Sequence, residues 1–105
     1  MTARLVIDPV ARAQARKADE WWRENRPKTV GLFATELQYA FGLIGDLSGA
    51  GVPVRSQILG LRRFLMSATC YHIYYRYLED SDEVVVLAIW SAVRRRGPPH
   101  RAWIP

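Results

Sequence analysis

The first half of the chain repeats its hydrophobic positions with the period of an α-helix, after one short β-branched run. That run, Arg4–Ile7, ends at Asp8 and Pro9, and these two residues suit the cap and the first turn of a helix. From Val10 to about Arg26 the hydrophobic positions recur every three or four residues. They are Ala11, Ala15, Ala18 and Trp22. A short strand followed by an amphipathic helix is therefore predicted.

A second helical pattern follows Pro27. The residue before a proline avoids the helical conformation, so the first helix should end near Asn25 and Arg26, and the proline is well placed to open the next one. The hydrophobic positions of this pattern are again three or four residues apart. They are Val30, Phe33, Leu37, Phe41 and Ile44, with Leu47 near the end. So short a connection predicts that the two helices pack as an antiparallel hairpin.

The period changes to two after Ser48–Pro53, which has the composition of a loop. Leu61–Met66 is a plausible strand, and Cys70–Tyr77 is a strong one with aromatic and β-branched residues throughout. A turn over Glu79–Asp82 leads to Glu83–Trp90, whose hydrophobic residues lie on both faces. Such a strand is typical of the interior of a sheet.

The order of these elements predicts an α+β fold, β-α-α-β-β-β. The N-terminal helical hairpin should pack on one face of a small, mainly antiparallel sheet, and the first strand should join it at the interior strand. Residues 1–98 form one domain in this interpretation, and residues 99–105 are a C-terminal tail. The second apolar face of Val84–Trp90 must then be covered by the tail, by a second copy or by another chain.

Charge narrows the choice of partner. The 105 residues include 15 basic and 10 acidic ones, a net charge of +5 that favours an acidic protein, a nucleic acid or another phosphate-rich partner.

Cys70 is the only cysteine, and we expect a buried or half-buried thiol rather than a nucleophile. The chain has neither a signal-peptide pattern nor an apolar run of about 18 residues, so a soluble, cytoplasmic protein with no membrane contact is expected.

Basic and aromatic side chains gather on the predicted meander. Its arginines are Arg62, Arg63, Arg76, Arg94, Arg95 and Arg96, and His72 and Tyr74 share a strand face with Arg76. Guanidinium groups bind phosphate and carboxylate in a bidentate manner, so this face could hold and cleave RNA, or it could dock an acidic peptide, which we favour. Trp21 lies off the helical stripe and could seal an edge or contact a partner. No catalytic motif, metal site or cofactor is expected.

In these same segments the chain resembles the ParE/RelE toxins, and the ParE branch more specifically. The resemblance runs from about Arg4 to Pro98. Its anchors are Val6–Pro9, Trp21–Pro27, Leu61–Leu65, Tyr71–Tyr77 and Val84–Trp90 followed by Arg94–Arg96. It implies the toxin of a type II toxin–antitoxin system, often a plasmid- or chromosome-stabilising module. Its ParD-like or other antitoxin would be acidic, and operator DNA would be bound only through that antitoxin.

The resemblance also implies where each partner would bind. ParE toxins inhibit DNA gyrase and are not enzymes, and on this interpretation Arg94, Arg95 and Arg96 contact the target. The antitoxin would cover the sheet face. Its expected contacts are Arg62, Arg63, His72, Tyr74, Arg76 and Trp90.

The alternative is a RelE-type ribosome-dependent mRNA endoribonuclease with Arg76, His72 and Tyr74 as its catalytic residues. RelE toxins use lysine and arginine with a tyrosine near the C-terminus, whereas here no tyrosine follows Tyr77 and the only lysines lie in the helical half. The usual histidine after the last strand is also absent. The departures in lysine and tyrosine favour the ParE branch.

Overall fold

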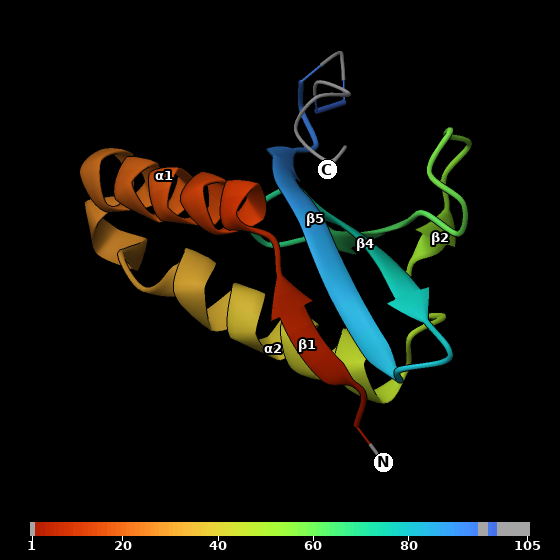
Figure 1. Cartoon of the computed structure of the whole chain (residues 1–105). Helices are drawn as coiled ribbons and strands as arrows, with labels where there is room; N and C mark the ends of the chain where they lie inside the picture. Colours follow the sequence, from red (N-terminus) through yellow and green to blue (C-terminus); the bar gives the residue numbers. More distant parts are fainter. Residues whose placement is uncertain (1, 95–96, 99–105) are drawn as a thin grey trace.

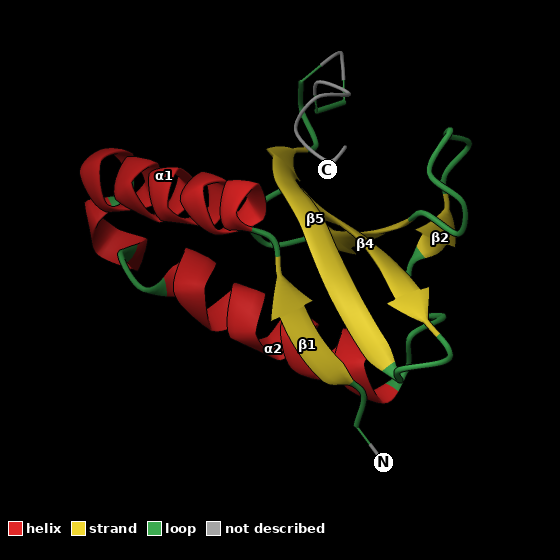
Figure 2. Cartoon of the chain, in the orientation of Figure 1, coloured by secondary structure: helices red, strands yellow, loops and turns green. Residues whose placement is uncertain are grey.

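Two helices cover one face of a five-stranded sheet in the computed structural model, which describes residues 2–94 and 97–98 (Figure 1). The helices are α1 (Pro9–Asn25) and α2 (Leu32–Asp46). The strands are β1 (Arg4–Ile7), β2 (Val52–Pro53), β3 (Arg62–Met66), β4 (Tyr71–Leu78) and β5 (Glu83–Ser91). Their order in the sheet is β1-β5-β4-β3-β2, and Figure 2 shows the helical layer on one side of it. The predicted α+β fold is confirmed.

The N-terminal strand and helix form where the pattern predicts them. β1 pairs in parallel with β5, so β5 lies inside the sheet between β1 and β4. The Asp8 carboxylate accepts a hydrogen bond from the Val10 amide at 2.8 Å, and so caps α1. Ala11, Ala18 and Trp22 on the predicted stripe are buried. Small alanines on this stripe let the helix approach the sheet closely.

The second helix begins later than predicted. Pro27 opens a short 3-10 turn (Pro27–Thr29), and α2 starts at Leu32 behind Gly31. Val30 therefore lies outside the helix and is 42% exposed. The physical reason is local: the 3-10 turn reverses the chain direction, and glycine is a poor helix former that serves better as a cap.

The three C-terminal strands form the predicted antiparallel meander. β4 begins at Tyr71 rather than at Cys70, because Cys70 has a φ of 59° and belongs to the preceding turn. Its thiol is exposed, so the prediction of a buried or half-buried cysteine was wrong. The turn over residues 79–82 closes with Asp82 at a φ of 51°, a conformation that aspartate tolerates better than most residues.

A β-bulge divides the apolar residues of β5 between the two faces. Tyr74 pairs with Ala88 but Tyr75 pairs with Val86, so Leu87 is an extra residue on β5. Leu87 and Ala88 consequently both lie on the distal face, by which we mean the sheet face opposite α1 and α2. The helix side keeps Val86 in the main core.

The chain itself covers part of this distal face. Val54, Ile58 and Leu61, from the loop between β2 and β3, pack against the distal cluster of Tyr74, Leu87 and Ala88. β2 was predicted as loop, because two residues carry no periodicity of their own. The sequence suggested the tail, a second copy or another chain as the cover of this face, and the loop between β2 and β3 is a further one.

Among the described residues, neither helix has the length and hydropathy that a membrane span requires.

Candidate functional site

Five of the residues expected to bind an antitoxin share the distal face. Arg63 pairs with Tyr74 across β3 and β4, and His72 pairs with Trp90 across β4 and β5. Arg76 lies two residues beyond Tyr74 on the same strand, and therefore on the same face. The alternation of β4 brings these side chains together, as the sequence predicted.

Arg62 lies on the other side of the sheet. It pairs with the fully buried Tyr75, and its Nη1 donates to the Gly51 carbonyl oxygen at 2.7 Å. A second, longer bond reaches the Gly49 carbonyl oxygen at 3.5 Å. Arg62 thus holds the loop before β2, and it does not converge with Arg63. Its contact with an antitoxin stays a prediction.

The His72 imidazole is the titratable group of this face. Burial lowers its pKa from the usual value, and the Arg63 guanidinium lowers it further. Its ring packs edge-on against Tyr74, with the ring centres 5.9 Å apart. His72 is therefore neutral at neutral pH, and Tyr74 beneath it is only 4% exposed. Arg76 is half-buried, and its Nε has no hydrogen-bond partner among the described residues.

Two hollows flank Arg63 on the distal face. One, of about 460 Å³, is bounded by Arg55 and Tyr74 and by Gly97 and Pro98. The other, of about 410 Å³, is bounded by Val52, Leu65 and His72, of which Val52 is 56% exposed and Leu65 50% exposed. Cationic and apolar surface alternate here, which suits a partner segment that carries both acidic and apolar side chains.

The expected target-binding arginines follow β5. The guanidinium carbon of Arg94 lies 4.2 Å from the centre of the Trp90 ring, a cation–π contact. Arg94 therefore touches a residue expected to bind the antitoxin, so the two predicted surfaces adjoin. Arg95 and Arg96 lie outside the described residues.

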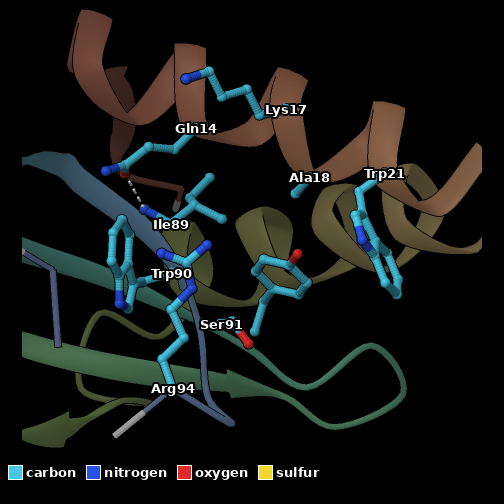
Figure 3. A pocket seen from close by; sticks show the side chains of 9 residues that line it. Gln14, Lys17, Ala18, Trp21, Ile89, Trp90, Ser91 and Arg94 are labelled. Carbon is cyan, nitrogen blue, oxygen red and sulfur yellow. Dashed lines mark hydrogen bonds between the residues drawn. The ribbon is translucent and has the colours of Figure 1, made fainter. Parts of the chain in front are cut away.

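The sequence did not predict a second cavity. It lies where α1 passes the end of β5, and Figure 3 shows Gln14 and Trp21 on the helical side with Trp90 and Arg94 opposite. The sequence singled out Trp21 as an edge seal or a partner contact, and Trp90 and Arg94 as partner contacts, but it did not predict that the three border one groove. Gln14 and Tyr71 gave no signal, because a polar helix position and a half-buried strand tyrosine are common in any fold.

Chemically, these surfaces can bind anions and apolar groups. Within residues 2–94 and 97–98, no three histidine, cysteine or acidic side chains lie close enough to hold a metal ion. The distal face offers one neutral imidazole beside guanidinium groups, and its tyrosine is largely covered.

No protein-family model matches this chain, and no curated protein sequence does either. Solved structures do match it. A chain of the RelBE2 toxin–antitoxin complex of Mycobacterium tuberculosis gives a TM-score of 0.65 at 20% identity, over 87% of this chain and 99% of that chain. A chain of the chromosomal ParDE system of P. aeruginosa gives 0.66 at 14% identity, over 86% and 96%. The isolated E. coli RelE toxin gives 0.51 at 16% identity, over 88% and 86%. The chain therefore has the RelE/ParE-like fold.

Proposed function

We propose that this chain is the toxin of a type II toxin–antitoxin system, of the ParE type, which inhibits DNA gyrase and is silenced by a cognate antitoxin. The observation that carries the proposal is the fold: its likeness spans nearly the whole length of chains from RelBE2 and ParDE. The net charge of +5 and the cationic distal face support an acidic partner. The toxin would act in the cytoplasm, where both partners are made.

The distal face is the proposed docking surface of the antitoxin. Val52 and Leu65 leave apolar area exposed beside Arg63, and Arg55 extends the positive charge along the neighbouring hollow. An acidic antitoxin segment with interspersed apolar residues would neutralise these charges and cover that area. It would fold on binding, because such segments are too polar to fold alone.

Several observations favour a gyrase inhibitor over a nuclease. Proton transfer requires a side chain that can reach the substrate, and Tyr74 is 4% exposed. Arg62 is turned to the opposite side and held by backbone carbonyls. The lysines, Lys17 and Lys28, lie in α1 and in the 3-10 turn rather than on the distal face. Contacts with a protein target need none of this chemistry.

Pulse labelling after induced expression without antitoxin tests the proposal. Thymidine incorporation is expected to fall before leucine incorporation, together with a DNA-damage response, and the purified protein should inhibit gyrase supercoiling. Leucine incorporation falling first, with gyrase unaffected, would reject the gyrase assignment. Unimpaired growth with the folded protein present would reject the toxin assignment.

A charge-matched pair of variants tests the target surface. Replacing Arg94–Arg96 with alanine should abolish growth inhibition while the circular dichroism spectrum is unchanged. Replacing Arg12, Arg16 and Lys28, which are exposed on the helical half, removes the same charge and should leave toxicity intact. Retained toxicity in the folded 94–96 variant would show that the target binds elsewhere.

One observation favours the nuclease as the second candidate. His72 is neutral at neutral pH and lies on the same face as Arg63 and Arg76, so it could accept a proton beside groups that bind phosphate. This reading predicts that His72→Ala protects cellular mRNA, whereas Tyr39→Ala, on the exposed side of α2, does not. Intact mRNA in cells that express the unmodified chain would exclude it.

A further inference from the structure

Where α1 passes the end of β5, the two elements border a groove that shares only Trp90 and Arg94 with the proposed toxin contacts. Figure 3 shows the residues of its walls, which are Gln14, Lys17 and Trp21 from α1, Trp90 in β5 and Arg94 just after β5. Tyr71 of β4 also lines it. This part holds about 230 Å³. Trp21, Tyr71 and Arg94 also border a neighbouring hollow of about 460 Å³, which adds Trp22 and Arg26. We call the two together the α1–β5 groove.

The α1–β5 groove combines aromatic rings with positive charge. Lys17, Arg26 and Arg94 line it, and no aspartate or glutamate does among the residues the structure describes. Trp21 is 46% exposed, so the ring can be reached from solvent. An anionic ligand with a flat ring therefore finds both of its binding elements here.

The aromatic rings of the groove already stack on planar cations. Arg94 lies 4.2 Å from the centre of the Trp90 ring, and Arg26 lies 5.9 Å from the centres of Trp21 and Trp22. Both guanidinium groups are exposed. They can thus turn toward a phosphate while a planar group takes a place against the rings.

Two backbone groups of β5 at the groove already have partners, which argues against an extended peptide. β1 pairs with β5 only as far as Val86, so an added strand could in principle continue along the same edge. The Ile89 amide, however, donates to the Gln14 side-chain oxygen at 2.8 Å. The Ser91 carbonyl oxygen accepts from the Arg94 amide. These two bonds would have to break before a peptide strand could pair here, so recognition by the side chains is favoured.

We infer that the α1–β5 groove binds a nucleotide unit of single-stranded nucleic acid, with the base against the exposed Trp21 ring and the phosphate on Arg94 and Lys17. The inference does not depend on the toxin assignment, although Arg94 belongs to both, because it is tested on the purified chain without target or antitoxin and rests also on Trp21 and Lys17. A base has the flat face that the rings accept, and its phosphate supplies the charge that the three cations require.

Fluorescence anisotropy with labelled oligouridylate and oligothymidylate of about eight nucleotides tests this. Trp21→Ala and Arg94→Glu should each weaken binding about tenfold or more, the loss typical of a stacking or phosphate contact. The matched controls are Tyr39→Ala and Arg12→Glu, since both residues are exposed and neither lines the groove. They should change affinity less than about twofold. Thermal unfolding verifies that every variant is folded.

The salt dependence of binding distinguishes a specific contact between Arg94 and a phosphate from nonspecific attraction to the basic surface. The slope of log affinity against log salt should decrease by about 0.7 when Arg94 is replaced, because one phosphate contact on a single strand is lost. Arg12→Glu should leave the slope unchanged. Binding of uridine monophosphate alone would indicate a free nucleotide as the source, and a preference between the two oligomers would indicate RNA or DNA.

Three results would overturn the inference. One is that neither oligomer nor the mononucleotide binds at low salt. Another is that Arg12→Glu weakens binding as much as Arg94→Glu, which would mean attraction to the whole basic surface. The third is that an acidic peptide, such as oligoglutamate, displaces the oligomers and loses affinity in Trp21→Ala, which would make the occupant a peptide.

Discussion

Removing the hydroxyl group of Tyr75 should destabilise the whole domain. The Tyr75 side chain is fully buried beneath the loop before β2. Its hydroxyl accepts a hydrogen bond from the Gly51 amide at 2.8 Å and donates one to the Ser48 carbonyl oxygen at 2.7 Å. Tyr75→Phe keeps the ring in the core and removes both bonds.

The size of the destabilisation depends on whether each former hydrogen-bond partner of the hydroxyl can bind water instead. The Gly51 residue is buried, so its amide is left without a partner, at a cost of about 1–3 kcal/mol. The Ser48 residue is half-buried and its carbonyl oxygen can find water, so that loss is nearer to about 1 kcal/mol. We expect the free energy of unfolding to decrease by about 2–4 kcal/mol. For a domain of this size, Tm would fall by roughly 8–25 °C.

Urea and thermal unfolding followed by circular dichroism measure this effect. The matched control is Tyr77→Phe, because the Tyr77 hydroxyl also donates one hydrogen bond, to Asp82 at 2.6 Å, but is exposed to solvent. Its loss should lower the free energy of unfolding by less than about 1 kcal/mol. If the two variants unfold at the same urea concentration, the loop before β2 is not held as described, and the reasoning fails.

Three further perturbations probe the loops and the distal face. Gly51→Ala should destabilise the fold by about 1–3 kcal/mol in urea unfolding, because the added Cβ would lie 2.8 Å from the carbonyl oxygen of Arg63; an unchanged midpoint would contradict this. Glu36→Gln should speed hydrogen exchange at Thr69, since the Glu36 carboxylate accepts bonds from its amide and hydroxyl, at 2.9 and 2.6 Å; unchanged protection would show that the carboxylate is dispensable. His72 should titrate below about 6.5 by NMR, and Arg63→Gln should raise its pKa. The folded state binds this proton more weakly than the unfolded chain, so His72 does not lower the free energy of unfolding above about pH 6.5 and lowers it as the pH drops below that value. If the pKa of His72 does not rise in Arg63→Gln, Arg63 is not a cause of its shift.

The periodicity of the sequence determined most of the fold. The three- and four-residue spacing of Ala11, Ala18 and Trp22 marked the buried face of α1, and the alternation of β4 put His72 and Tyr74 on one face. Each of these features depends on neighbours within a few residues along the chain. Such short-range patterns survive in any tertiary context that buries the apolar side.

Tertiary structure alone decided which groups Arg62 binds and that Cys70 lies in a turn. Both positions had the composition of a strand, and only the turn conformation of Cys70 exposes its thiol. Arg62 has its partners in the loop before β2, on carbonyl oxygens whose position depends on the buried Tyr75. No local sequence pattern predicts a contact between a side chain and a loop that is distant in the chain.

The bulge in β5 and the α1–β5 groove were likewise beyond reach of the sequence. Leu87 and Ala88 share the distal face because β4 skips one residue of its partner, a choice made by pairing between strands. Gln14 reaches Ile89, 75 positions away in the chain, only once α1 packs across β5. The sequence by itself determined the elements and their buried faces, since these follow from local period and propensity. The register between elements, and hence the α1–β5 groove and the bulge in β5, was decided by long-range packing.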